Sequence, residues 1–413
     1  MSIIIAILVI VYWYAYCYNF YRVTAQRRIN MKKLGVIGFG GRLHGDVIQA
    51  LCDVSDEFKV TAIADPATDK VRERIEKKPR GIAENVELYD DADKLLAEAD
   101  VDAILIGTRC SLHTTMAIKA MERNVPIFLE KPVCTSMEDL QRLNDANKKY
   151  NPRVLVSFPL RFSAITVLVK EILDSGKIGE ILQVDAYNDV PYGRVYYQNW
   201  HRDENETGGL WLQKATHDFD YLNYLLNDKA TEVFARDVRK LFKGDMPAGM
   251  TCDKCDKTKT CPESPYIVRN KYLDYRKGPY CCFAVDTGNE DCGTALMKRE
   301  SGAIVSYSQN FFARHNAARR GARFYGYNGT LEFDWYKGEI KVYMHTSPHV
   351  ETYALKDSGT AHFGGDQKLA EMFLDIMNGT NVSYLNEGME SALQCLMAKQ
   401  SCETGSNIII PEL

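Results

Sequence analysis

The first half of the chain alternates short apolar runs with amphipathic stretches. The apolar runs predict strands, and the stretches between them have helical spacing. The predicted strands lie at residues 33–37, 59–64, 102–106 and 125–129, and the clearest helices at residues 43–52 and 113–123. Alternation of this kind predicts an α/β domain with a parallel sheet, over residues 31–150.

The second half, from about residue 151 to residue 413, has a different pattern. Alternating runs there predict long strands joined by short turns, and Asn328-Gly329 between two such runs is a strong hairpin signal. We therefore predict an α+β domain with an open, mostly antiparallel sheet. Its strands are expected at residues 180–188, 294–298, 303–311, 323–327, 330–335 and 339–345, and closing helices at residues 367–377 and 387–403.

Residues 1–30 form an apolar leader that differs from the rest of the chain. The stretch 2–21 carries no charge, and three arginines follow it by position 28. Its length suffices for a membrane anchor, and basic residues on that flank favour a cytoplasmic body. Two alternatives stay open: an overextended start, with the natural one at Met31, and a signal peptide, which the lack of a basic region before the apolar stretch disfavours.

The composition is that of a globular protein with two or three domains. Of 413 residues, 46% are hydrophobic, and 51 basic residues nearly balance 55 acidic ones, leaving a formal net charge of −4. A nucleic-acid partner requires a basic surface, so this balance argues against one.

The turn after the first predicted strand matches part of a dinucleotide-binding fingerprint. Gly38 permits a tight turn, and Gly40 lets a pyrophosphate approach the backbone at a helix N-terminus. Leu43 replaces the third glycine, so the match is only moderately specific. The segment predicts a Rossmann domain whose cofactor residues follow the strand ends: Gly38, Phe39, Gly40, Gly41, Arg42, Asp65, Thr108, His113, Glu130 and Lys131.

The expected cofactor is NAD, with NADP less favoured. Asp65 ends the second strand, where a carboxylate accepts two ribose hydroxyls and repels a 2′-phosphate. Pro66 and Ala67 offer no cation to neutralise that phosphate. Arg42 is the exception, because it could reach a phosphate from the turn.

Six of the twelve cysteines lie between residues 252 and 292, within a predicted insert at 244–292. Cys252 and Cys255 form a CxxC pair, and four thiolates can hold a structural zinc. The spacing is irregular and a second CxxC is missing. An iron–sulfur cluster and free thiols are the alternatives. The candidate zinc ligands are Cys252, Cys255, Cys261 and Cys281, with Cys282 as a substitute for the last.

Residues 31–413 resemble the Gfo/Idh/MocA family, named after glucose–fructose oxidoreductase, inositol dehydrogenase and rhizopine catabolism. The resemblance rests on VIGFGGRLHG, on the aspartate in VTAIADP, on GTRCSLHTTMAIKAMERNVPIFLEKPV and on RFSAITVLVKEILDSGKIGEILQVDAY. A histidine followed by a helix, a strand and Glu-Lys-Pro is its most specific part. The resemblance places Lys131 of that motif at the nicotinamide, where it would help proton transfer at the sugar carbon.

Residues 208–220 resemble a second motif of the family, in which His217 and Asp220 match. Gln213 stands where the family's dehydrogenases usually have an aspartate. A glutamine can neither take a proton nor hold a charge on the histidine. Lys214, beside it, is a candidate to replace the lost electrostatics, with a solvated helix face as the alternative.

The antiparallel sheet covers the nicotinamide in the family and would hold the substrate here. Arginine and aromatic side chains suit a polyhydroxylated ligand, because rings pack on C–H faces and charged donors bind hydroxyls. For Tyr187 and Trp200, ordinary core is the alternative. The substrate candidates are Arg161, Tyr187, Trp200, His201 and His362, beside Lys214 and His217.

We predict an NAD-dependent oxidoreductase that moves a hydride between the cofactor and a hydroxyl of a sugar, an inositol or a sugar acid. One alternative is a glycoside-cleaving enzyme that uses tightly bound NAD for transient oxidation and elimination. A second is a non-catalytic dinucleotide sensor, which the presence of Lys131 and His217 disfavours. We expect a carbohydrate or polyol as substrate, a homo-oligomer, and a cytoplasmic location with or without an anchor through residues 2–21.

Overall fold

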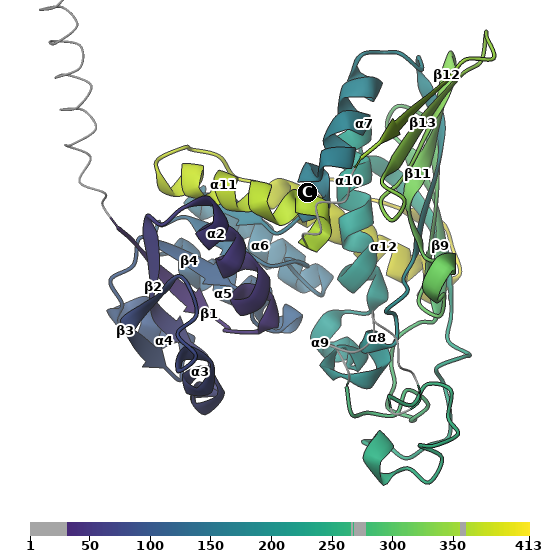
Figure 1. Ribbon diagram of the computed structural model, residues 1–413. Helices are drawn as coiled ribbons and strands as arrows, with labels where there is room; N and C mark the ends of the chain where they lie inside the picture. Colours follow the sequence, from purple (N-terminus) through teal and green to yellow (C-terminus); the bar gives the residue numbers. More distant parts are fainter. Residues whose placement is uncertain (1–30, 266, 268–277, 356–360) are drawn as a thin grey trace, which may run out of the picture.

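The structure is a computed structural model (Figure 1) that describes residues 31–265, 267, 278–355 and 361–413. The predictions for the apolar leader concern residues 1–30 and lie outside this range. Within the described ranges, no helix has the length and apolar character needed to cross a membrane. Two sheets organise the described chain, one parallel and one mostly antiparallel.

The first sheet has six parallel strands in the order β3-β2-β1-β4-β5-β6. Its central strands are buried and almost wholly apolar, because helices cover both faces. This order and these helices make a doubly wound Rossmann domain, as predicted. The strands are β1 (Lys32–Ile37), β2 (Phe58–Ala64), β3 (Ile82–Tyr89), β4 (Ala103–Ile106), β5 (Ile127–Leu129) and β6 (Val154–Val156).

Helices link these strands, and capping residues define both ends of helix α6. Helix α6 begins where the Ser136 side chain accepts a hydrogen bond from the amide of Asp139, and it ends at Asn151 in the left-handed conformation. The glycine turn leads into a short π-helical segment before α2. The helical segments are η1 (Leu43–Val47), α2 (Ile48–Val54), α3 (Thr68–Ile75), α4 (Ala92–Glu98), η2 (Cys110–Leu112), α5 (His113–Met121) and α6 (Met137–Tyr150).

The second sheet has nine strands in the order β14-β13-β12-β11-β7-β10-β9-β8-β15. Only β7 and β10 pair in parallel, so the sheet is mostly antiparallel, as predicted. The Asn328-Gly329 turn joins β11 to β12. The strands are β7 (Ile181–Asp189), β8 (Ala230–Val238), β9 (Cys292–Arg299), β10 (Ile304–Asn310), β11 (Arg319–Gly326), β12 (Gly329–Asp334), β13 (Glu339–Met344), β14 (Val350–Ala354) and β15 (Ile408–Ile409).

Helices cover one face of this sheet, and α7, α10 and α12 lie along it in Figure 1. Apolar side chains of α10 and α12 join those of the sheet in one core. The helical segments are η3 (Pro159–Phe162), α7 (Ala164–Asp174), α8 (Val195–Gln198), η4 (Trp200–Arg202), α9 (Glu204–Thr207), η5 (Trp211–Ala215), α10 (Thr216–Leu226), η6 (Cys252–Lys254), η7 (His315–Ala317), η8 (Ala361–Gly364), α11 (Gly365–Met377) and α12 (Leu385–Thr404).

Helix α11 returns from the second domain to the first. Figure 1 shows it crossing to the side of the parallel sheet where α2 lies. Its residues Leu369, Phe373 and Ile376 share a buried cluster with Leu51 and Phe128 of the Rossmann domain. A segment far along the chain therefore locks the two domains together beside the glycine turn.

Two features differ from the sequence-based division of the chain. Strand β6 pairs with β5, so the parallel sheet reaches past residue 150, where the first domain was expected to end. The apolar triplet of β6 is too short to be recognised by periodicity. The described part of the cysteine-rich segment contains the short turn η6, and isolated bridges join Met246 to Ala284 and Thr251 to Tyr280.

Candidate active site

The candidate residues of the Rossmann domain follow the carboxyl ends of adjacent strands. Ile37 of β1 is aligned with Ala64 of β2 and with Ile106 of β4, and β4 is in turn aligned with Leu129 of β5. Residues that follow these positions therefore meet at one edge, which is where open α/β sheets bind ligands.

The glycine turn is shaped for close approach of a ligand. Gly38 has a φ of +84°, and a Cβ there would lie 2.7 Å from the amide nitrogen of Thr108. Gly40 has only one heavy atom within 4 Å of such a Cβ, the carbonyl oxygen of Gly107 at 3.7 Å, and Gly41 has none. Gly38 is thus required by the fold, whereas the space beside Gly40 and Gly41 fits a pyrophosphate on backbone amides.

Asp65 closes this turn from the second strand. One carboxylate oxygen accepts a hydrogen bond from the amide of Phe39 at 2.9 Å, and the other accepts one from the amide of Ala67 at 2.9 Å. The carboxylate is therefore fixed beside the glycine turn, where a dinucleotide has its adenosine ribose.

Arg42 is held inside the protein by three carboxylates. Its Nε lies 3.0 Å from Glu130, its Nη2 2.5 Å from Asp366, and its Nη1 3.5 Å from Asp46. These partners raise the pKa of Arg42, although burial alone would lower it. The guanidinium of Arg42 thus joins the Rossmann domain to α11.

Arg74 is a residue near the cofactor turn that sequence reasoning missed. It comes from α3, and its guanidinium donates a hydrogen bond to the carbonyl of Phe39. Together with Lys77, it also contributes to the lowered pKa of His44, for which burial is the larger cause. A basic residue in the helix after the acidic strand end was the signal available in the sequence.

His113 braces the loops that carry the site. Its Nδ1 lies 2.7 Å from the carbonyl oxygen of Pro132, and its Nε2 lies 3.3 Å from that of Thr108. The ring is buried, and burial lowers its pKa. Both ring nitrogens face backbone groups, so His113 positions the loops after β4 and β5 and does not point to a ligand.

Lys131 directly follows Glu130 at the end of β5. Its ammonium donates to the carbonyl oxygen of Gln213 at 2.9 Å, so it connects the first domain to the helical turn η5 of the second. Burial, followed by the field of Lys214, lowers the pKa of Lys131 from 10.5 to about 8. A lysine with such a pKa can be neutral near physiological pH and accept a proton.

The turn that carries Gln213 and Lys214 is π-helical. Such turns are rare and occur often at functional sites. The amide oxygen of Gln213 lies 3.6 Å from the Cys110 sulfur, and the Lys214 ammonium donates to the hydroxyl of Tyr192 at 2.9 Å. Lys214 is only 6% exposed, so it is not on a solvated helix face.

His217 begins the regular part of this helix and is buried among cations. Its ring lies 5.9 Å from that of Phe158 and 6.0 Å from that of His362, centroid to centroid. Burial is the first cause of its lowered pKa, and Lys131 and other cations add to it. Its Nδ1 is buried without a hydrogen-bond partner among the described residues, which suits a ligand hydroxyl.

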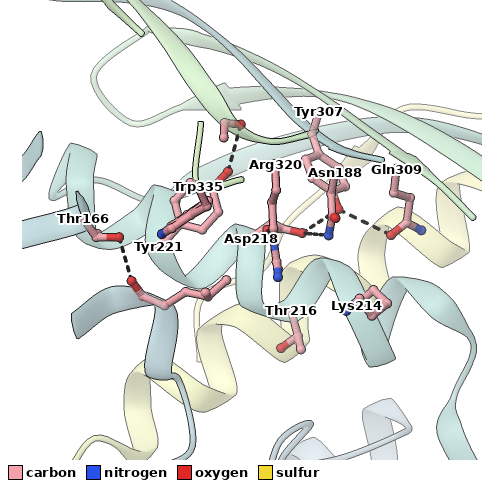
Figure 2. A network of polar contacts seen from close by, with 12 residues as sticks. Thr166, Asn188, Lys214, Thr216, Asp218, Tyr221, Tyr307, Gln309, Arg320 and Trp335 are labelled. Atoms are coloured by element: carbon pink, nitrogen blue, oxygen red, sulfur yellow. Dashed lines mark hydrogen bonds and ion pairs between the residues drawn. The ribbon is translucent and has the colours of Figure 1, made fainter. Parts of the chain in front are cut away.

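Asp218 holds the helix to the sheet and was not singled out from the sequence. Figure 2 shows Asn188, Tyr307 and Arg320 converging on its carboxylate. The distances are 2.7 Å from Asn188, 2.9 Å from Tyr307 and 2.7 Å from Arg320. The neighbour of His217 is thus fully engaged and turned toward the sheet, so it does not replace the aspartate expected at position 213.

Only some of the predicted substrate residues lie near Lys131, Lys214 and His217 in the structure. His362 lies beside His217, and its Nδ1 is 2.8 Å from Asp366. Arg161 instead forms a buried ion pair with Asp220. Tyr187 alternates with the inward-facing Asn188 along β7, so it points to the opposite face of the sheet.

Trp200 and His201 form a separate aromatic pair. Their rings stack at 3.9 Å, and the guanidinium of Arg109 lies 3.9 Å from the Trp200 ring. Arg109 follows β4 in the Rossmann domain, so this contact joins the two domains. The side chain of Trp200 is half-buried.

The described cysteines of the cysteine-rich segment are not arranged as a metal centre. No disulfide joins the described cysteines, and in the described part of the chain no group of three or more Cys, His, Asp or Glu residues is arranged to hold a metal ion. The backbone amide of Cys252 donates to the carbonyl of Pro279, and that of Cys281 to the carbonyl of Met250, so the two segments that carry these cysteines lie side by side. Burial raises the pKa of Cys252 to about 11.

Two family descriptions match the chain and together cover most of it. "Oxidoreductase family, NAD-binding Rossmann fold" matches residues 32–158, and "GFO/IDH/MocA C-terminal domain" matches residues 166–332. The chain belongs to the Gfo/Idh/MocA family. It is thus an oxidoreductase with an NAD-binding Rossmann domain, which confirms the resemblance found in the sequence.

Relatives within the family share modest identity with this Gfo/Idh/MocA chain. YteT of Bacillus subtilis (strain 168), named as an oxidoreductase, is 27% identical over 83% of this chain and 88% of its own length. Myo-inositol 2-dehydrogenase of Thermotoga maritima is 28% identical over 49% of this chain and 57% of its own.

Solved structures agree on the fold. A levoglucosan dehydrogenase in complex with NADH and levoglucosan has a TM-score of 0.72 at 18% identity, covering 92% of this chain and 100% of its own. A scyllo-inositol dehydrogenase from Lactobacillus casei, with NAD(H) and scyllo-inositol, has a TM-score of 0.67 at 18% identity, covering 92% and 99%. At these identities the likeness supports the fold and assigns no substrate to this chain.

Proposed function

We propose that this protein oxidises a hydroxyl group of a sugar or polyol, or reduces the corresponding carbonyl, with NAD(H) as cofactor and Lys131 as the acid–base group. The observation that carries the proposal is the pKa of Lys131, which burial lowers to about 8. A strongly perturbed lysine at the carboxyl end of a Rossmann strand is a candidate for catalysis.

The glycine turn and Asp65 would hold the cofactor. Gly40 and Gly41 leave space for the pyrophosphate, and Asp65 would accept the ribose hydroxyls. When bound, oxidised NAD supplies the acceptor for the hydride that leaves the substrate carbon. Arg42 is occupied by three carboxylates, which removes the main argument for NADP.

Lys131 would take the hydroxyl proton while the carbon–hydrogen bond breaks. Its hydrogen bond to the carbonyl of Gln213 fixes the ammonium between the domains, and the neutral amine has a lone pair for the proton. His217 would bind a substrate hydroxyl through its buried Nδ1. Its lowered pKa keeps the imidazole neutral, so it can donate and accept hydrogen bonds.

The second candidate function is glycoside cleavage through transient oxidation. In that reaction NAD accepts the hydride, the acidified neighbouring carbon loses a proton, and the aglycone leaves as an alcohol after taking up a proton. Water then adds to the resulting double bond, and the hydride returns to the carbonyl. Gln213 favours this alternative, because the aspartate expected for a plain dehydrogenase is absent. Product formed without net NADH would identify it.

The test of the main proposal is an assay of the purified chain with NAD and a panel of sugars, inositols and sugar acids. Formation of NADH in proportion to oxidised product is the expected result. Release of an alcohol from a glycoside without net NADH supports the second candidate. Tight NAD binding with neither reaction supports a dinucleotide sensor.

We also propose that the cysteine-rich segment binds one zinc ion through Cys252, Cys255, Cys261 and Cys281. Cys252 begins the short turn η6 and Cys255 directly follows it, and backbone hydrogen bonds join the segments that carry Cys252 and Cys281. The four thiol groups would have to come closer to one another and lose their protons when zinc binds. Metal analysis of the purified protein tests this proposal.

A further inference from the structure

The arginines around Lys131 are matched by carboxylates. Arg42 is paired with Glu130 and Asp366, and Arg320 is paired with Asp218. These carboxylates are committed to their arginines by close contacts. They are therefore poor partners for any other cation in the site.

Lys131 and Lys214 have no such carboxylate partner among the described residues. Among the described residues neither Lys131 nor Lys214 forms an ion pair, and their ammonium groups bond to a backbone carbonyl and to the hydroxyl of Tyr192. Lys214 is buried, and the field of Arg320 adds to the burial that lowers its pKa. Burying an ammonium group without a counter-ion is costly, so a fold that keeps one has a use for it.

His217 gives an independent sign of missing negative charge. The main influences on its pKa are burial, Lys131, Arg320, His362 and Lys214, and each of them lowers it. None of these main influences is a carboxylate, and the buried Nδ1 has no partner in the described part of the chain. The position one turn earlier is the neutral Gln213. The site thus combines excess positive charge with a free hydrogen-bonding atom.

We propose that the substrate carries a carboxylate group and that Lys214 binds it. The inference rests on the proposed function, because it adds a charged group to the sugar or polyol that Lys131 acts on. Lys131 must be neutral to take a proton, which leaves Lys214 as a buried cation without an ion pair among the described residues. One positive charge matches a carboxylate better than a doubly charged phosphate. A uronic acid has both a carboxylate and hydroxyls to oxidise.

The site then needs no aspartate at position 213. A substrate carboxylate brings its own negative charge next to the lysines, and a second carboxylate on the protein would repel it. The substitution by glutamine and the buried Lys214 beside it are explained together. A neutral substrate leaves both features unexplained.

The test compares sugars that differ only in this group. Initial rates with NAD are measured for glucuronate, galacturonate and mannuronate, each against its neutral aldose and its methyl ester. Calorimetry measures binding of the same compounds to the NADH-loaded chain. A charge-assisted contact is expected to favour the acid by roughly 10- to 100-fold in kcat/KM and in affinity.

Variants locate the effect on Lys214. Lys214→Met is expected to lower the acid-to-aldose ratio of kcat/KM by a similar factor, whereas Lys214→Arg retains most of the preference. Tyr192→Phe distinguishes binding of the substrate by Lys214 from structural support of Tyr192 by Lys214. If Lys214 only anchors Tyr192, then Lys214→Met and Tyr192→Phe change the kinetics of the acid and of the aldose to the same extent. Lys170→Met, which removes an ion-paired lysine on α7, is the matched control.

The outcomes separate this inference from the proposed function. NAD-dependent oxidation in which the aldose equals or exceeds its acid leaves the function standing and overturns the carboxylate site. If no sugar is oxidised, the proposed function fails, and calorimetry still decides the inference. Equal affinity for acid and aldose, or an acid preference that survives Lys214→Met, overturns it.

Discussion

Replacing Lys131 by methionine removes the proposed base while keeping a side chain of similar length. We expect Lys131→Met to bind NAD normally and to lose roughly 10²- to 10⁴-fold in turnover, the usual contribution of general acid–base catalysis. Lys131→Arg is the matched control for charge. It retains a cation and a donor to the carbonyl of Gln213, but it cannot become neutral, so it is expected to be equally inactive.

The magnitude follows from the lowered pKa. With an ordinary pKa of 10.5, only roughly 0.03% of the lysine would be neutral at pH 7, whereas a pKa of about 8 makes roughly 9% neutral. Burial thus increases the reactive form about 300-fold. Because the base must be unprotonated, kcat/KM for oxidation is expected to fall as pH decreases below about 8 and to level off above it.

The same shift predicts an effect on stability. The folded-state pKa of Lys131 lies below the unfolded value, so the folded protein carries a penalty that is full below about pH 8 and disappears as pH rises to 10.5. Lys131→Met removes this penalty. Since the side chain is half-buried, we expect a gain of roughly 1–3 kcal/mol at pH 7 that shrinks at high pH.

The assay is a pair of measurements on wild type and both variants. Initial rates are followed from about pH 6 to about pH 10, and urea unfolding is measured at both ends of that range. If Lys131→Met keeps near-normal turnover and its kcat/KM falls at low pH as in the wild type, the base is another group. In that case Lys214 and His217 would be the next residues to test.

Three further predictions concern other parts of the molecule. NAD is expected to bind more tightly than NADP, and Asp65→Ser is expected to reduce the difference between the two affinities. Tighter binding of NADP by the wild type would refute this prediction and would point to Arg74 as the residue that binds the 2′-phosphate. Gln213→Asp is expected to lower activity near pH 7, because a carboxylate beside Lys131 raises its pKa and pairs with Lys214; a clear gain in hydride transfer would return the protein to the plain dehydrogenase class. The full chain is expected to contain about one zinc ion that is lost in Cys252→Ser; metal-free protein with unchanged activity and melting temperature would remove the zinc proposal.

The sequence predicts the fold well where local patterns and global structure agree. The apolar runs at 33–37 and 59–64 correspond to β1 and β2, because buried parallel strands are apolar throughout. The Asn328-Gly329 turn marks the hairpin between β11 and β12. Strand β6 is missed because three buried residues carry no periodicity, and β3 because its partly exposed residues lack a clear apolar run.

The candidate site is predicted only in part, because spacing shows neighbours on one element and not contacts between elements. Lys131 follows a strand end, so its location could be inferred. Arg42 was named as a residue that could reach a phosphate, and its partner Asp366, which lies 324 residues further along the chain, could not be inferred from spacing. The family motif places an aspartate at position 213, but the turn there is π-helical, and the side chain of Gln213 contacts Cys110.

The most direct test of the central claim is transfer of an isotope from substrate to cofactor. The full chain is incubated with NAD and with sugars, inositols and uronic acids that are deuterated at every carbon, and the dinucleotide is analysed by mass spectrometry. The account predicts deuterated NADH with at least one of these compounds, formed at least about 100-fold more slowly by Lys131→Met. An NAD-loaded protein that forms no labelled NADH with any member of the panel would contradict it.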